Sequence, residues 1–267
     1  MTNSRGILAC AFLLALLSGA AWGEERNVDG IMDNSFLIEE AYNQEAGVVQ
    51  HIGTFSRPDG GDAWDFSFTQ EWPLGGIQHQ LSFTLPAQYE AGLGTGVGDI
   101  GVNYRYQLAG NDSARLHVAP RLTVLLPTGS ENSGRGAGSV GFQSNLPLSY
   151  VLGPAIATHL NAGLTLIPDA AGSATTTSFN LGASAIWRVR RAVNLMLEAV
   201  WLSTESAGAG GTVREESAFL NPGVRWAFDF PGGLQIVPGL AYTIGLGPSS
   251  GDDAIFLYLS FEHPFKR

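Results

Sequence analysis

Over most of its length the chain alternates apolar and polar residues with a period of two. In one such stretch, Val193, Leu195, Leu197, Ala199 and Trp201 fall on one face and Asn194, Met196 and Glu198 on the other. Successive side chains of a β-strand point to opposite sides of the strand, so this stretch predicts a strand with one apolar and one polar face. About a dozen stretches of this kind follow residue 46. Their number and length are the sequence signature of a transmembrane β-barrel.

We therefore expect an all-β fold: an antiparallel up-and-down transmembrane barrel of about twelve strands over residues 47–267. The expected strands are 47–57, 62–74, 77–88, 98–109, 114–127, 139–151, 155–167, 176–189, 192–204, 217–229, 234–247 and 254–265. Short turns alternate with mostly longer connections that are rich in Gly, Ser, Asp and Glu, at 58–61, 89–97, 128–138, 168–175, 205–216 and 248–253. Outer-membrane barrels have short periplasmic turns and longer outer loops. The alternation therefore puts both chain ends on the periplasmic side.

The N-terminus has the features of a cleaved signal peptide over residues 1–23. Arg5 supplies the positive region, residues 7–17 are apolar, and Ala21-Trp22-Gly23 is a small-residue cleavage site before Glu24. The apolar run is too short for a membrane-spanning helix. The one cysteine, Cys10, falls in this segment, so the exported chain is expected to have no disulfide. The predicted location is the outer membrane of a Gram-negative bacterium.

Charge and composition limit the partners. Charged residues make up 14% of the chain and its net charge is −10, which argues against nucleic acid as a partner. The expected partners are outer-membrane lipid and lipopolysaccharide, the barrel-assembly machinery during insertion, and a small-molecule solute. Acidic clusters in the expected loops are either solvated surface or sites where divalent cations bridge to lipopolysaccharide. We expect no cofactor, and no metal site because metal-ligand spacing such as His-x-x-x-His is absent.

Residues 24–46 do not follow the alternation. Asn34 or Ser35 is a candidate cap for a short helix. We consider two interpretations, a leader or cap on the periplasmic side of the barrel and a plug inside its lumen. The side chains that would form a plug are Phe36, Glu39, Glu40, Tyr42 and Glu45.

Four charged residues are expected to point into the lumen near mid-strand: Arg105, Arg121, Glu198 and Arg225. They form either a charged constriction that selects solutes by size and sign or a neutralised network that holds the lumen together. Counting across the connection at 205–216 places Glu198 diagonal to Arg225 and predicts an ion pair. Glu71 or Glu45 is expected to balance Arg105 and Arg121. If acids of the N-terminal segment do so, that segment is a plug.

Three motifs stand out in the chain. They are the run FLIEEAYNQEAGVVQHI within residues 33–52, Gly96-Val97-Gly98-Asp99-Ile100 before Asn103-Tyr104-Arg105-Tyr106, and Pro120-Arg121-Leu122 before Leu126-Pro127-Thr128-Gly129. Together they resemble one group of outer-membrane proteins, the transporters of the meta-pathway of phenol degradation. The last predicted strand ends near Phe265, as in the C-terminal recognition signal of such barrels, although Lys266-Arg267 follow it. The resemblance covers essentially the whole exported chain and implies a barrel that admits small hydrophobic or aromatic compounds.

An outer-membrane lipid-modifying enzyme is one alternative. His117 and His159 are expected to face the lumen, and His79 faces lipid near a periplasmic turn. We find no Ser–His–acid set at matching depth, so we predict a non-enzyme with no catalytic residues. The expected function is a channel for passive passage of small molecules, and the other alternative is a structural or adhesion barrel without transport.

Overall fold

The computed structural model describes residues 30–111, 114–170, 174–208 and 211–265. The predicted signal peptide, residues 1–23, lies outside the described residues. Among the described residues, no helix is long and apolar enough to cross a membrane.

The described chain contains 15 strands and two short 3-10 helices, η1 (Glu131–Ser133) and η2 (Gly247–Ser249). The strands are β1 (Val48–Pro58), β2 (Trp64–Pro73), β3 (His79–Glu90), β4 (Gly94–Val97), β5 (Ile100–Tyr106), β6 (Leu116–Val118), β7 (Arg121–Leu126), β8 (Gly141–Gly153), β9 (Ile156–Ala170), β10 (Ala174–Arg190), β11 (Val193–Gly208), β12 (Gly211–Trp226), β13 (Phe228–Asp229), β14 (Gln235–Leu246) and β15 (Ala254–Pro264).

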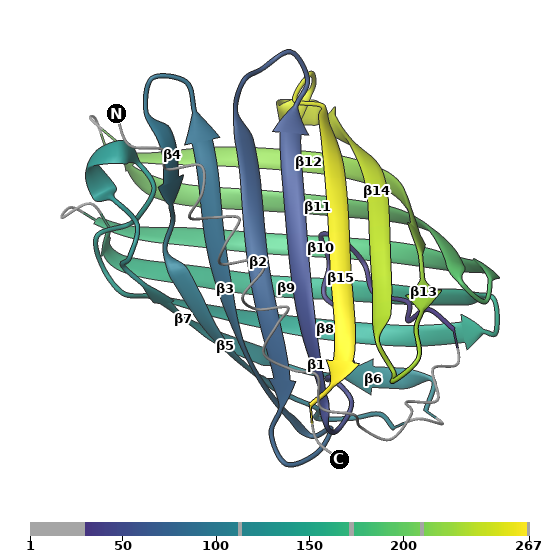
Figure 1. The fold of residues 1–267 in the computed structure, drawn as a ribbon. Coiled ribbons are helices and arrows are strands. Elements are labelled where there is room, and N and C mark those ends of the chain that lie inside the picture. The colour runs from purple at the N-terminus through teal and green to yellow at the C-terminus, as the bar shows by residue number, and fades with distance from the viewer. Residues whose placement is uncertain (1–29, 112–113, 171–173, 209–210, 266–267) are drawn as a thin grey trace, which may run out of the picture.

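These strands form one closed antiparallel barrel (Figure 1). Neighbouring strands of the barrel follow chain order, β12 pairs with β14, and the pairing of the last strand, β15, with the first, β1, closes the ring. Three strand positions of the barrel are each filled by two strands that follow one another in the chain: β4 and β5, β6 and β7, and β12 and β13. The 15 strands therefore make a barrel of twelve strand positions. This confirms the predicted fold class.

The alternation along each strand sorts side chains between the two faces of the wall. On β11, Leu195 and Leu197 are more than two-fifths exposed, whereas Asn194 and Glu198 are completely buried. Exposed leucines, valines and aromatic residues form an apolar belt around the outside. Because every backbone polar group of a closed barrel is paired within the wall, such a belt suits a hydrocarbon surrounding.

Three predicted strands are interrupted. The expected strand 114–127 breaks between β6 and β7, where Pro120 has no backbone N–H to donate to the ladder. The expected strand 98–109 begins earlier, as β4, and breaks before β5 at Gly98-Asp99. There the Asp99 carboxylate accepts the backbone N–H groups of Gly129 and Ala137. The third, 217–229, breaks between β12 and β13.

Two predicted outer loops are largely strand. The hairpin β9–β10 extends over most of 168–175, and β11–β12 extends over most of 205–216. Charged residues at 205–216 indicate a loop by composition, but Glu205 faces Arg214 across the hairpin and forms an ion pair of 2.9 Å with it. Cross-strand pairs of this kind allow a polar hairpin to continue beyond the membrane.

Candidate functional site in the barrel lumen

Residues 30–46, hereafter the N-terminal segment, run inside the barrel (Figure 1, purple behind β15). The predicted short helix does not form, because inward-facing side chains of the wall take up much of the segment's main chain. The segment's N–H groups at 36, 37, 39, 41, 43 and 44 donate to Glu198, Asn161, Ser149, Gln107 and Gln80. Its carbonyls at 30, 32, 33, 34, 39, 40, 41 and 42 face Gln235, Asn194, His159, Arg225, Asn161, Arg105 and Gln107.

Glu198 anchors the middle of this segment. Its Oε1 accepts the N–H groups of Phe36 at 3.0 Å and Leu37 at 2.9 Å, and its Oε2 accepts the Asn221 amide at 2.8 Å. The predicted ion pair between Glu198 and Arg225 is therefore wrong. In the hairpin register Glu198 faces Asn221, and Arg225 faces Asn194. The prediction counted across a connection that is mostly strand and placed Glu198 opposite residue 223, which put the register two residues out.

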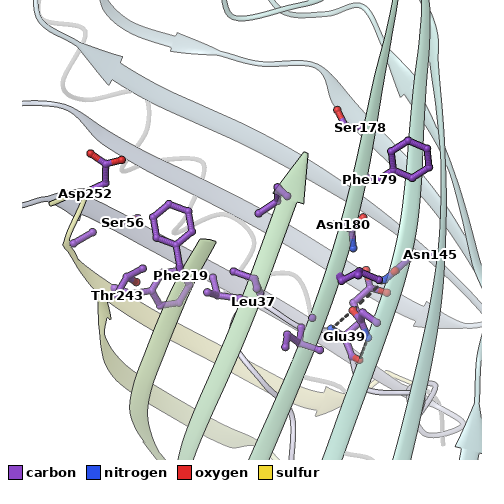
Figure 2. Close-up of a pocket in the computed structure, with 18 of the residues that line it drawn as sticks. Leu37, Glu39, Ser56, Asn145, Ser178, Phe179, Asn180, Phe219, Thr243 and Asp252 are labelled. Atoms are coloured by element: carbon purple, nitrogen blue, oxygen red, sulfur yellow. Dashed lines mark hydrogen bonds between the residues drawn. The ribbon is translucent and has the colours of Figure 1, made fainter. Parts of the chain in front are cut away.

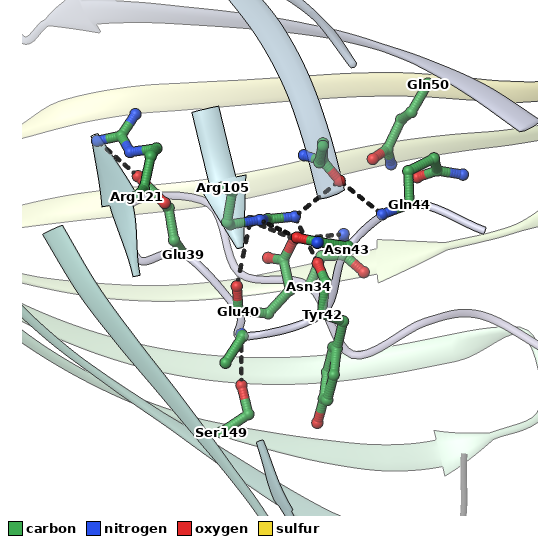
Figure 3. A network of polar contacts seen from close by, with 12 residues as sticks. Asn34, Glu39, Glu40, Tyr42, Asn43, Gln44, Gln50, Arg105, Arg121 and Ser149 are labelled. Atoms are coloured by element: carbon green, nitrogen blue, oxygen red, sulfur yellow. Dashed lines mark hydrogen bonds and ion pairs between the residues drawn. The ribbon is translucent and has the colours of Figure 1, made fainter. Parts of the chain in front are cut away.

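Arg105 on β5 lies at the centre of a polar network (Figure 3). Its guanidinium donates to the carbonyls of Glu40 and Tyr42 and, at 2.9 Å, to Asn43 Oδ1. The Glu40 carboxylate lies 3.9 Å from Arg105 Nη1, and both side chains are largely buried. Burial raises the pKa of the Glu40 carboxyl from 4.5 to about 7, and the Arg105 charge opposes this rise.

Arg121 on β7 is the second lumen arginine with an acidic partner. Its Nη2 lies 2.8 Å from Glu39 Oε1, and the guanidinium also donates to Asn103 and Gln143. Among the described residues, the acids within ion-pair distance of the two arginines are thus Glu40 and Glu39. Glu71, which was expected to balance them, borders the middle part of the lumen together with both arginines but forms no ion pair of 4.0 Å or less with either. Glu45, the other N-terminal candidate, lies in the turn to β1, where its carbonyl accepts the Val48 N–H.

A Ser–His–Asp cluster that the sequence analysis missed lies under the segment. Ser149 Oγ is 2.7 Å from His159 Nδ1, and His159 Nε2 is 2.8 Å from the Asp33 carbonyl and 4.0 Å from its carboxylate. Ser149 and His159 are completely buried, and Ser149 Oγ also accepts the Ala41 N–H. The cluster therefore holds the main chain of the segment. Asp33 comes from a region without periodicity, so no sequence signal placed it beside His159.

The Phe36 ring packs into a recess in the barrel wall that is formed by β12, β14 and β15. An ideal Cβ added to Gly223 or to Gly239 would lie only 2.6 Å from the Phe36 ring. The ring centroids of Phe256 and Tyr258 are 5.4 and 5.3 Å from that of Phe36. We call this recess, formed by these two glycines and two aromatic residues, the ring slot.

Three cavities follow one another along the lumen. Successive residues of β1 mark their order. Gln50 borders the smallest, a neck of about 30 Å³. Ile52 and Thr54 border a middle cavity of about 340 Å³, and Ser56 and Pro58 border an outer cavity of about 750 Å³. The N-terminal segment borders all three.

The outer cavity has two kinds of lining (Figure 2). Leu37 and Phe219 contribute apolar surface, whereas Asn145, Asn180 and Glu39 contribute polar groups. The cavity can therefore contact a solute that has both an apolar body and a polar group. The inward parity of Asn145 and Asn180 was visible in the sequence, but their grouping in one cavity depends on register between distant strands.

Solved structures with a similar fold are outer-membrane barrels. An outer-membrane channel from Pseudomonas putida matches with a TM-score of 0.66 and 15% identity, covering 84% of this chain and 98% of that one. The NanC porin has a TM-score of 0.54 and 9% identity, covering 82% and 100%. The CymD monoaromatic hydrocarbon channel has a TM-score of 0.50 and 12% identity, covering 84% and 90%. No curated protein sequence matches the chain.

The fold and its outward-facing apolar belt are those of a barrel in the Gram-negative outer membrane. Residues 27–242 match the family described as MetA-pathway of phenol degradation. This match covers most of the sequence and agrees with the motifs noted within residues 33–52 and around Arg105 and Arg121. The chain therefore belongs to the MetA-pathway of phenol degradation family.

Proposed function

We propose that the protein is an outer-membrane channel for passive passage of small molecules, including hydrophobic or aromatic compounds, and that the N-terminal segment is its plug. The narrowing of the lumen carries this proposal. Cavities of about 750 and 340 Å³ lead from the loop end to a neck of about 30 Å³, roughly the space of a single water. Residues 42–45 border that neck, so withdrawal of the segment would widen it.

The family and the similar structures support a channel with small-molecule solutes. One protein of similar fold, CymD, is named as a channel for monoaromatic hydrocarbons, and the family is named for phenol degradation. In this chain, the mixed lining of the outer cavity suits a solute with an apolar body and a polar group. In this proposal, the four charged residues of the lumen bind the plug in the first place and form a charged constriction only secondarily. They are Arg105, Arg121, Glu198 and Arg225. Contact with lipopolysaccharide and the barrel-assembly machinery is part of the same proposal. We propose no catalytic role, because Ser149 and His159 are fully engaged beneath the plug.

Single-channel recording in a planar bilayer tests the proposal. The mature chain is compared with a variant that lacks residues 24–46, both refolded in detergent. We expect the mature chain to conduct rarely and the truncated chain steadily. A Leu37→Ala variant serves as a control, since Leu37 is exposed to the outer cavity and its removal leaves the main-chain docking in place. Silence in the mature and truncated chains alike would favour the structural or adhesion barrel.

A further inference from the structure

The ring slot is shaped for an aromatic ring that does not belong to the wall. Gly223 and Gly239 lie on β12 and β14, and a side chain at either position would occupy the space of the Phe36 ring. The slot is open on one side, since Phe36, Phe256 and Tyr258 all border the middle cavity. A small solute in that cavity therefore reaches the edge of the slot without crossing the barrel wall.

Arg225 lies beside the slot, and no residue that the structure describes supplies it with a counter-ion. It is 1% exposed, and among the described residues no carboxylate lies within 4.0 Å of it. Its Nη1 donates to the carbonyl of Asn34, its Nη2 is 3.5 Å from the Tyr258 hydroxyl, and its Nε has no hydrogen-bond partner in the described part of the chain. The guanidinium carbon is 4.7 Å from the centre of the Tyr258 ring. A buried cation held only by neutral groups is costly, and a carboxylate would satisfy it better.

We propose that the ring slot and Arg225 together form a binding site for a small aromatic carboxylate, which displaces residues 34–36 of the N-terminal segment. The ligand's ring takes the position of the Phe36 ring. Its carboxylate takes the position of the Asn34 carbonyl on Arg225. Segment and ligand therefore compete for one site, and the ligand shifts the population toward the released segment.

The geometry supports this competition because both halves of the site border the same side chains. Tyr258 contacts the Phe36 ring on one side and the Arg225 guanidinium on another. Gly239 lies opposite Arg225 in the ladder and against the Phe36 ring. A ligand with one ring and one adjoining carboxylate matches this spacing, and its charged hydrogen bonds to Arg225 exceed in strength the bond to a carbonyl.

Calorimetric titration of the refolded mature protein with benzoate, in detergent solution, tests the site. Phe36→Ala removes the internal competitor, so we expect it to bind benzoate at least tenfold more tightly than the wild type does. Benzyl alcohol, which has the ring without the charge, is expected to bind at least tenfold more weakly than benzoate. Phe142→Ala is the matched control, because Phe142 is an exposed phenylalanine of β8 that borders none of the three lumen cavities, and it is expected to keep the wild-type affinity.

Two further variants examine the two halves of the site in the Phe36→Ala background. Arg225→Gln removes the charge, whereas Gly239→Ala retains the charge and fills part of the slot, with its new Cβ also 3.0 Å from Arg225 Cγ. Each is expected to reduce benzoate affinity at least tenfold, and Gly239→Ala remains informative if Arg225→Gln does not fold. Unchanged affinity in Phe36→Ala, or equal binding of benzoate and benzyl alcohol, would overturn the proposal.

Release of the segment is measured separately, by the rate at which a Glu-specific protease cuts at Glu39 and Glu40. Benzoate is expected to accelerate the cut in the wild type, and an unchanged rate at saturating benzoate would overturn the displacement. The proposed binding site rests on the proposed function in one respect: both require that the N-terminal segment can leave its place in the lumen. A protein that binds benzoate but conducts nothing after truncation would refute the channel and leave the site standing.

Discussion

Replacing Glu198 by Gln tests the anchoring of the N-terminal segment by one buried carboxylate. Glu198 Oε1 accepts two backbone N–H groups, from Phe36 and Leu37. A hydrogen bond to a charged group contributes about 1.5–3 kcal/mol and a neutral one about 0.5–1.5 kcal/mol. The amide keeps an oxygen for both donors, and Asn221 can turn its own oxygen toward the new NH₂ group. The change therefore removes charge more than contacts and weakens docking by about 2 kcal/mol in total.

At about 1.4 kcal/mol per factor of ten, this loss raises the population of released segment about 30-fold. The Glu-specific protease measures that population through the initial cutting rate at Glu39 and Glu40, provided that the segment redocks faster than it is cut. Glu205→Gln is a matched control on the same strand. Glu205 is 44% exposed and pairs with Arg214 at the loop end, where such a pair contributes less than about 1 kcal/mol. Equal cutting rates in the two variants would refute the anchoring role.

Three more perturbations follow from the lumen geometry. Glu39→Gln removes the carboxylate that pairs with Arg121 at 2.8 Å when the segment is docked, so docking should weaken and the open probability in single-channel recordings should rise; an unchanged open probability would contradict this. Burial raises the pKa of Glu40 to about 7. The docked segment therefore holds a proton on Glu40 below about pH 7, whereas the released segment holds it only below about pH 4.5. Docking should strengthen, and open probability fall, as pH drops from about 7 to 4.5, and Glu40→Gln should abolish this dependence; a response that persists in the variant must come from another group. A Cβ on Gly182 would lie 3.0 Å from Ile38, so Gly182→Val should weaken docking by about 1–3 kcal/mol and speed proteolysis, whereas Gly153→Val, with open space around it, should do neither.

The faces of the strands could be predicted from sequence because alternation is a local property. Asn103 and Arg105 turn inward on β5, and Leu195 and Leu197 outward on β11, as their parity indicates. Register is different, because it depends on where each hairpin turns. The ion pair expected between Glu198 and Arg225 was wrong for this reason, since β11 and β12 continue almost to residues 209–210.

The path of the N-terminal segment could not be predicted in the same way. Its acids indicated that a plug was conceivable, and Glu39 and Glu40 do meet Arg121 and Arg105. Most of its contacts, however, join wall side chains to its main chain, and a main-chain group is the same at every residue. The sequence of the segment therefore carries little information about where each of its residues lies.

The main-chain docking also has a consequence for the order of assembly. The groups that hold the segment come from strands as distant in the chain as β3, with Gln80, and β14, with Gln235. No hairpin or half-barrel brings these groups together, so the segment has no complete binding site until the last strand, β15, has paired with the first, β1, and closed the ring. Entry of the segment must therefore be a late event, and the first described residues of the chain are among the last to reach their final place.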